Sequence, residues 1–263
     1  MKVSIITSCY NREATIRGCI ESVFGQDYPD IEYIVVDGAS SDKSLDIIKE
    51  EEQRTNDKDF ILSHPKFTMK IISEPDKGMY EAINKGLRAA TGDIIGLVHS
   101  DDFLYDHDTV SKIVYRFRLL GCDLVYGNGI FVDTENTDRI VRNWISGRYT
   151  RRKVYCGWLP LHPTVYITRK WLDKCGMYDE SYKIAADSDW LVRSLYDMSP
   201  KVSYMKEYIV RMRMGGMSTD PEKAKKKWSE DLRMYRSHGL PPKFALAGKI
   251  MSKIPQFIEA KFK

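Results

Sequence analysis

Residues 91–102 read Thr-Gly-Asp-Ile-Ile-Gly-Leu-Val-His-Ser-Asp-Asp, a short apolar run that ends in polar and acidic side chains. The run Ile94–Val98 is too short for a helix and is typical of a buried strand. Three comparable runs precede it, at Val3–Ser8, Glu32–Val36 and Lys70–Ser73. Because parallel strands covered on both faces carry near-continuous apolar side chains, these runs predict a parallel sheet.

Stretches with helical spacing separate these runs. We expect helices over Arg12–Phe24, Lys43–Glu52 and Met79–Ala90. The first helix has an apolar face that should lie against the sheet, made of Ile16, Ile20, Val23 and Phe24. The alternation of strand and helix over this part of the chain indicates the α/β class.

The alternation loosens after Leu120. Strands are expected at Leu124–Tyr126 and Ile130–Val132, with a turn at Gly127-Asn128-Gly129 between them. The remaining expected elements are two helices, a strand and two terminal helices, at Arg169–Cys175, Asp187–Tyr196, Lys201–Ile209, Pro221–His238 and Pro242–Phe262. The chain therefore reads as an α/β body followed by a helical extension.

The composition, with 43% hydrophobic and 30% charged residues in 263, is that of a soluble globular protein. Five scattered cysteines without a Cys-x-x-Cys pair favour a reducing, cytoplasmic setting. The apolar run after Met1 is too short for a signal peptide or a spanning helix, and we expect neither. The motifs G-x-x-x-x-G-K-S/T and G-x-G-x-x-G are absent after the first strand, which disfavours kinases, ATPases and dehydrogenases.

Positive charge is concentrated at the C-terminal end. The net charge is +4, but residues 221–263 hold eleven Lys or Arg against four Asp or Glu, or +7, which leaves 1–220 at −3. The segment Pro242–Phe262 is basic and amphipathic, as in helices that contact a membrane surface peripherally. Solvation, packing on the body of the protein, or packing on a second subunit of a homodimer are the alternatives. Confinement of the charge to this segment argues against nucleic acid as a partner.

Acidic residues follow three of the predicted strands. The strand ends continue as Asp37-Gly38-Ala39-Ser40-Ser41-Asp42, Glu74-Pro75-Asp76-Lys77-Gly78 and His99-Ser100-Asp101-Asp102. Any one of these acids could be a turn former or a helix cap. Ligands of open parallel sheets bind beyond the carboxyl ends of the strands, however, and clustered carboxylates need a cation to offset their repulsion. Oxygen ligands of this kind suit Mg²⁺ or Mn²⁺ shared with a substrate diphosphate.

Four ordered motifs are similar to those of the inverting glycosyltransferases of family 2, which have the GT-A fold of the nucleotide-diphospho-sugar transferase superfamily. They are Val3–Arg12, Tyr33–Asp42, Ser73–Gly86 and Thr91–Asp102. The resemblance implies a Rossmann-like, mostly parallel central sheet flanked by helices, with a C-terminal helical extension.

The same resemblance divides the chain. It implies a GT-A catalytic domain over 1–220, with a nucleotide-sugar donor half over 1–105 and an acceptor half over 106–220. Residues 221–263 would form the basic helical extension.

The resemblance implies a site for a nucleotide-diphospho-sugar such as a UDP-sugar. The residues that match donor-binding positions are Thr7, Cys9, Tyr10, Asn11, Arg12, Asp37, Asp76, Lys77, Gly78, Asn84, Asp101, His162 and Arg211. Asp101 and Asp102 together would bind the metal, Mn²⁺ or Mg²⁺, and the ribose of the donor, with one acid for each. His99 stands where many relatives carry a first acid. His162 could instead be a core-edge histidine. The segment Arg211–Ser218 resembles a late family segment near the diphosphate, and could instead be a plain loop.

Two later segments, Leu161–Tyr166 and Asp179–Trp190, resemble the acceptor side of the family. Asp187 falls at the position of the general base, with Asp189 as the fallback. Asp187 could also cap the helix that begins there, which is compatible with catalysis. The implied reaction is transfer with inversion to a glycan or lipid-linked glycan, at the inner face of the plasma membrane, in bacterial cell-surface polysaccharide biosynthesis.

Two other functions stay open. A sugar nucleotidyltransferase shares a similar fold but would carry a glycine- and lysine-rich loop after the first strand, and Thr7–Arg12 contains no glycine. A degenerate domain that only binds nucleotide-sugars is compatible with His99. Metal-dependent hydrolysis of a donor separates such a domain from an active transferase.

Overall fold

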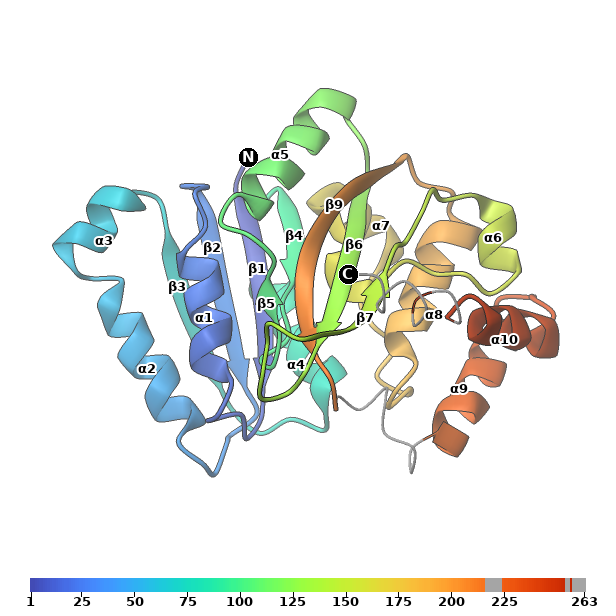
Figure 1. The fold of residues 1–263 in the computed structure, drawn as a ribbon, viewed down its shortest axis with the longest axis horizontal. Coiled ribbons are helices and arrows are strands. Elements are labelled where there is room, and N and C mark those ends of the chain that lie inside the picture. The colour runs from blue at the N-terminus through green and yellow to red at the C-terminus, as the bar shows by residue number, and fades with distance from the viewer. Residues whose placement is uncertain (216–223, 254–255, 257–263) are drawn as a thin grey trace.

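The computed structural model describes residues 1–215, 224–253 and 256, and its strands form one nine-stranded sheet (Figure 1). The strands are β1 (Val3–Cys9), β2 (Ile31–Asp37), β3 (Thr68–Ser73), β4 (Ile94–Leu97), β5 (Phe103–Leu104), β6 (Leu124–Val132), β7 (Ile140–Trp144), β8 (Tyr166–Thr168) and β9 (Val202–Arg213). Their order across the sheet is β3-β2-β1-β4-β8-β6-β9-β5, and β7 pairs with β6 off this path.

The helices connect and flank these strands. They are α1 (Ile16–Phe24), α2 (Ser44–Arg54), α3 (Lys58–Ser63), α4 (Met79–Ala89), α5 (Thr109–Leu120), α6 (Arg151–Tyr155), the 3-10 turn η1 (His162–Thr164), α7 (Arg169–Cys175), α8 (Ala186–Val192), the π-helical turn η2 (Arg193–Asp197), α9 (Ala224–Ser237) and α10 (Pro242–Met251).

The long ladders of the sheet are parallel. β1 pairs in parallel with β2 and β4, β2 with β3, and β6 with β9. The short pairings of β8, β5 and β7 are antiparallel. The predicted α/β class with a mostly parallel central sheet is therefore confirmed.

Two hydrophobic clusters cover the two faces of the sheet, because successive side chains of a strand point in opposite directions. Ile5 packs with α1 and α5 on one face, and Ile6 packs with α4 on the other. The second cluster continues through α7 and α8 to Tyr235 of α9 and Ala245 of α10. In Figure 1, α9 and α10 lie beside α8, at the end of the molecule far from β3.

The turn expected at Gly127-Asn128-Gly129 is wrong, since β6 runs unbroken through all three residues. The glycines are there because neighbouring segments approach closely. A Cβ on Gly127 would lie 2.7 Å from the Glu207 carbonyl oxygen, and one on Gly129 would lie 2.4 Å from Leu161 Cδ2. A pattern typical of turns thus marks tight packing inside a strand.

The C-terminal helices pack on the body of the protein. A Cβ on Gly248 would lie 1.8 Å from the Cys156 carbonyl oxygen, so backbone meets backbone where α10 docks. Phe244 and Met251 on the same helix stay exposed. Residues 254, 255 and 257–262 of the expected amphipathic segment lie outside the described residues. Within the described part of the chain, no helix is both long and apolar enough to cross a membrane.

The variant Gly248→Ala tests this docking. In an open helix the change stabilises by about 1 kcal/mol, because alanine has the higher helix propensity. Here we expect it to lower the free energy of unfolding by about 2 kcal/mol, since the new Cβ would overlap a backbone carbonyl. Gly18→Ala in α1 is the matched control, because its Cβ would meet only the Arg213 guanidinium, at 3.9 Å. Urea denaturation measures both, and stabilisation of both variants would contradict the docking.

Candidate active site

The loops after β1, β2 and β3 meet at one edge of the sheet. Cys9 and Asp37 are paired residues at the ends of β1 and β2. A Cβ on Gly38 would lie 2.4 Å from Asp76 Oδ2 and 3.4 Å from the Tyr10 ring, so the absence of a side chain at Gly38 lets the loops approach. The structure therefore brings together Tyr10, Asp37 and Asp76, which the sequence predicted at one donor site.

Asp37 anchors these loops from within. It is fully buried, and its carboxylate accepts hydrogen bonds from the Ser40 hydroxyl and, at 2.7 Å, from the Ser73 hydroxyl. Asn11, at a φ of 50°, accepts the Ser41 N–H at 2.9 Å with its side-chain oxygen. Both side chains thus hold the shape of the edge, and their contact with a donor stays a prediction.

The other residues of these loops that were predicted to bind the nucleotide-sugar fall into two groups, with side chains either buried in the core or exposed to solvent. Thr7 Oγ1 donates to the Val98 carbonyl at 2.7 Å inside the core. Burial raises the pKa of the Cys9 thiol to about 12, so Cys9 behaves as a small apolar residue. Of the residues predicted to bind the donor, those exposed to solvent at this edge are Tyr10, Arg12, Lys77 and Gly78.

Asn84 of α4 links the donor half to the acceptor half. Its side-chain nitrogen donates to the Tyr178 carbonyl at 2.9 Å and to Glu180 Oε1 at 2.8 Å. Its side-chain oxygen accepts the Tyr178 N–H at 3.0 Å. These three hydrogen bonds of the amide all go to residues 178–180. Its contact with the nucleotide-sugar stays a prediction.

Asp101 and Asp102 follow β4 and lie beside the end of β9. The Arg213 N–H donates to Asp102 Oδ1 at 3.1 Å, and Arg213 Nη1 donates to the Asp101 carbonyl at 2.7 Å. Asp102 Oδ2 is buried and has no hydrogen-bond partner among the described residues. Burial and the charge of Asp101 raise the pKa of Asp102 well above its ordinary value. A buried, unsatisfied carboxylate oxygen beside a second carboxylate fits a divalent cation.

The protein contributes few ligands to such a cation. Across residues 1–215, 224–253 and 256, no group of three or more His, Cys, Asp or Glu side chains is placed to hold a metal ion. Mg²⁺ is commonly bound by one or two carboxylates together with substrate phosphates and water. The site therefore fits a metal that arrives with a diphosphate, and does not fit a metal held by protein ligands alone.

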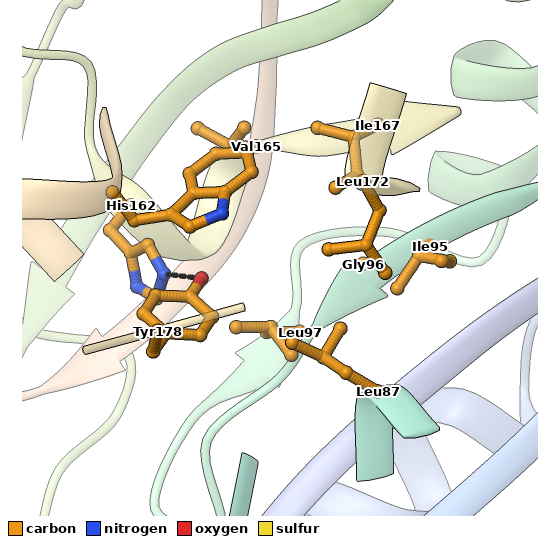
Figure 2. Close-up of a pocket in the computed structure, with 10 residues that line it drawn as sticks. Leu87, Ile95, Gly96, Leu97, His162, Val165, Ile167, Leu172 and Tyr178 are labelled. Carbon is orange, nitrogen blue, oxygen red and sulfur yellow. Dashed lines mark hydrogen bonds between the residues drawn. The ribbon is translucent and has the colours of Figure 1, made fainter. Parts of the chain in front are cut away.

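His99 and His162 lie between the two halves, with ring centroids 5.9 Å apart. His162 Nε2 and the Tyr178 hydroxyl share a hydrogen bond of 2.6 Å (Figure 2). These two side chains also line a cavity of about 20 Å³ together with apolar residues such as Leu97 and Val165 (Figure 2). A cavity of that size holds one water and not a sugar. His162 thus has the surroundings of a core-edge histidine, and its contact with a substrate stays a prediction.

His162 should make stability depend on pH. Burial lowers its pKa to about 4, whereas an unfolded chain has the ordinary value near 6.5. Between those values the unfolded chain binds a proton that the folded protein does not, so the free energy of unfolding falls as the pH drops from about 6.5 to about 4. The full loss amounts to about 3 kcal/mol.

The variant His162→Gln isolates this contribution. Urea denaturation of both proteins at pH 7.5 and pH 4.5 should show a smaller acid-induced loss in the variant than in the native protein. Equal losses in the two proteins would mean that His162 titrates normally in the folded state.

Asp187 lies in the first turn of α8. Its Oδ1 accepts the Ser188 N–H at 2.7 Å and lies 3.5 Å from the Tyr80 hydroxyl. Burial raises the pKa of Asp187, but the His162 imidazole, the Lys249 charge, the Ser188 N–H and the Lys227 charge outweigh that effect and keep the pKa below its ordinary value. The carboxylate is therefore ionised at neutral pH, which is the state that a general base needs.

Asp189, the fallback base, has other partners. Its carboxylate is buried and pairs with His238 Nε2 at 3.0 Å and with Arg193 Nη2 at 3.2 Å. Burial lowers the pKa of His238, but hydrogen bonds to Asp189 and Asp197 raise it above its ordinary value. These ion pairs occupy Asp189 inside the protein, and the geometry favours Asp187 as the base.

His99 lies near both the predicted metal ligands and the predicted base. Burial lowers its pKa, whereas the carboxylates of Asp101 and Asp187 both raise it. Both carboxylates therefore lie within electrostatic reach of one imidazole. Packed rings connect them: the His99 and His162 rings lie 5.9 Å apart, Tyr178 bonds His162 and stacks on Tyr80 at 5.8 Å, and the Tyr80 hydroxyl lies 3.5 Å from Asp187 Oδ1.

Arg211 lies in β9, which runs past its expected end at Ile209 because it pairs there with β5 and β6. The Arg211 guanidinium lies 4.8 Å from the centroid of the Tyr105 ring. Arg213, which was not among the predicted site residues, makes the contacts to Asp101 and Asp102. Residues at i and i+2 of a strand share a face, so the Arg-Met-Arg spacing was an available signal. Gly216, Met217 and Ser218 of the predicted segment lie outside the described residues.

Known proteins resemble this chain in sequence. The family model described as Glycosyl transferase family 2 matches residues 4–184. The PGL/p-HBAD biosynthesis glycosyltransferase of Mycobacterium bovis is 27% identical over 222 residues, which is 82% of this chain and 78% of that protein. The chondroitin synthase of Escherichia coli is 31% identical over 193 residues, which is 73% of this chain and 26% of that protein.

Solved structures resemble it in fold. S. aureus TarS 1-349 in complex with UDP-GlcNAc has a TM-score of 0.67 and 18% identity, covering 100% of this chain and 73% of that one. This chain spans 44% of the longer TarS chain. Mannosyltransferase PcManGT from Pyrobaculum calidifontis, in complex with GDP-Man and Mn²⁺, has a TM-score of 0.65 and 17% identity, covering 98% and 73%.

Proposed function

This chain belongs to glycosyl transferase family 2 and has the GT-A fold, and we propose that it moves a sugar from a nucleotide-diphospho-sugar to an acceptor hydroxyl with inversion at the anomeric carbon. One observation carries the proposal: a chain of packed rings runs from His99, beside Asp101, through His162 and Tyr178 to Tyr80, whose hydroxyl lies 3.5 Å from Asp187 Oδ1. A single displacement needs a base on one side of the sugar and a stabilised leaving group on the other, and this region offers both.

The donor in this proposal is a UDP- or GDP-linked hexose. Support comes from the structural relatives, since TarS was solved with UDP-GlcNAc and PcManGT with GDP-Man and Mn²⁺. In this chain the exposed Tyr10 could stack on a base, and the exposed Arg12 and Lys77 could meet phosphate charge.

Asp102, with Asp101 beside it, would hold Mn²⁺ or Mg²⁺. A divalent ion bound there supplies charge neutralisation for the departing diphosphate. Arg213 holds the Asp102 carboxylate through its backbone N–H and the Asp101 backbone carbonyl through its guanidinium. In this assignment Asp102 faces the ion with its buried Oδ2, and Asp101 is left to bind the ribose.

Asp187 takes the proton of the acceptor hydroxyl as the new bond forms. The acceptor oxygen attacks the anomeric carbon, and the bond from that carbon to the donor phosphate oxygen breaks, with its electron pair leaving on the nucleoside diphosphate. Because the attack and the departure occur on opposite faces, the configuration inverts. Holding both substrates together in the orientation for reaction lowers the barrier by several kcal/mol, up to about 11.

We propose a glycan or lipid-linked glycan as the acceptor, in cell-surface polysaccharide biosynthesis at the cytoplasmic side of the membrane. The support is the names of two relatives, a PGL/p-HBAD biosynthesis glycosyltransferase and a chondroitin synthase. Exposed apolar side chains on α10, at Phe244, Ile250 and Met251, are compatible with peripheral contact with a membrane.

A donor panel tests the function. UDP-GlcNAc, UDP-glucose, UDP-galactose and GDP-mannose are offered with and without Mn²⁺, and released UDP or GDP is measured with glycan and glycolipid acceptors present. NMR of the product should show an inverted anomeric centre, and retention would contradict the mechanism. Binding without release would favour a degenerate nucleotide-sugar-binding domain. Formation of a nucleotide-sugar from a sugar phosphate and a nucleoside triphosphate would favour a nucleotidyltransferase.

A further inference from the structure

The segment that leads into α8 is capped by a carboxylate from the C-terminal extension. Glu230 of α9 accepts the N–H of Lys183 at 3.1 Å, of Ile184 at 2.8 Å and of Ala185 at 3.0 Å. The first N–H groups of a helix have no partner within the helix itself. Ala185 occupies the cap position of α8 and has no side chain that could satisfy them. Glu230 accepts the N–H of this cap residue and of the two residues before it, from 45 to 47 residues away in the sequence.

Other contacts of the extension hold the same segment. The Arg233 guanidinium lies 3.9 Å from the centroid of the Tyr182 ring and donates to the Ser181 carbonyl at 3.2 Å. Lys249 of α10 donates to the Ser188 hydroxyl at 2.9 Å, just past Asp187. The extension thus contacts the chain on both sides of the predicted base.

The sheet side of the segment is held by α4. The Tyr80 hydroxyl donates to the Ile184 carbonyl at 2.8 Å, while Glu230 accepts the N–H of the same residue. One peptide segment is therefore fixed from opposite sides by two helices. Asp187 is two residues after Ala185, so the position of its carboxylate depends on where this segment lies.

We propose that Glu230 is a positioning residue for Asp187: by accepting the N–H groups of residues 183–185 it fixes where the carboxylate of the base lies. This inference rests on the proposed role of Asp187. A catalytic group displaced by about 1 Å can lose on the order of 100-fold in rate without any change in its own chemistry. The C-terminal extension would then be part of the catalytic unit.

The variant Glu230→Gln keeps the size of the side chain and removes the charge that attracts three N–H groups. We expect kcat for nucleoside diphosphate release to fall about 10- to 100-fold while KM for the donor stays near the native value. The variant Glu230→Asp keeps the charge and should recover part of the loss. Unchanged kcat in a folded Glu230→Gln protein would overturn the proposal, as would a loss confined to KM.

Glu51→Gln is the control for a loss of stability alone. Glu51 of α2 is also a fully buried carboxylate with cationic partners, Arg17 and Arg54, but it lies on the far part of the donor half. We expect this variant to lower the melting temperature and to keep kcat at temperatures where it is folded. If Glu51→Gln and Glu230→Gln reduced kcat equally at equal loss of melting temperature, Glu230 would be merely structural.

A double-mutant cycle with Asp187→Asn separates this inference from the proposed function. In the Asp187→Asn background Glu230→Gln should have little further effect, because the position of an absent base no longer matters. A full and independent loss in that background would overturn the positioning role. Native activity in Asp187→Asn alone would instead remove the base assignment, whatever Glu230 does.

Discussion

The variant Asp187→Asn is expected to lower kcat for sugar transfer by about 10³-fold and to leave donor binding nearly intact. Asparagine can still accept the Ser188 N–H that Asp187 accepts at 2.7 Å, so the start of α8 should keep its shape. What the variant loses is the ability to take a proton from the acceptor. Coupled detection of released nucleoside diphosphate gives kcat, and titration calorimetry with UDP and Mn²⁺ gives donor affinity.

Asp189→Asn is the matched control on the same helix. It removes a carboxylate that pairs with His238 and Arg193 and lies two residues after the predicted base in α8. Breaking a buried ion pair should lower the free energy of unfolding by about 3 kcal/mol. Below its unfolding temperature the variant should keep most of its kcat. The reverse outcome, an inactive Asp189→Asn beside an active Asp187→Asn, would move the base to Asp189.

The donor half of the fold could be predicted from the sequence because its information is local. Each of β1, β2, β3 and β4 is a short apolar run, and the edge of a parallel sheet gathers whatever follows those runs. The meeting of Asp76 with Tyr10 at Gly38 is a direct consequence. The sequence therefore predicted which loops would come together.

The direction of individual side chains was harder to predict. All of β1 and β2 is buried or nearly so, and an unbroken apolar run does not indicate which alternate residues face the core. Thr7 and Cys9 were assigned to the donor by position in a motif, and the structure turns both side chains inward. Gly127 and Gly129 show the same limit, because glycine serves turns and close approach equally well.

The support for the predicted base could not be inferred from local pattern at all. Glu230 and His238 contact residues 183–185 and Asp189 only after the chain has folded back on itself. In sequence both belong to the basic segment 221–263 and form part of no recognisable motif. The positive charge of this segment suggested contact with a membrane. That α9 and α10 pack on the core beside α7 and α8 depends on tertiary structure and not on local sequence.

Asp102→Asn is expected to weaken metal-dependent donor binding by about 100-fold, the scale on which changes around a metal site act. The amide oxygen can still accept the Arg213 N–H, which Asp102 Oδ1 accepts at 3.1 Å, so the segment should stay in place. The neutral amide cannot replace the buried Oδ2 as an anionic ligand. In the native protein, removal of Mn²⁺ by EDTA should reduce UDP affinity strongly, and in the variant EDTA should change little.

Thermal shift gives a second readout of the same prediction, independent of activity. Mn²⁺ and UDP together should raise the melting temperature of the native protein, because a ligand that binds only the folded state stabilises it, and the rise should be absent in Asp102→Asn. Asp106→Asn is the control, because Asp106 is an exposed acid just beyond β5 whose carboxylate pairs with His107. Retention of the full Mn²⁺ effect in Asp102→Asn would mean that this buried carboxylate does not hold the metal. The unsatisfied Oδ2 would then need another cationic or hydrogen-bonding partner, because a buried carboxylate oxygen without one is strongly destabilising.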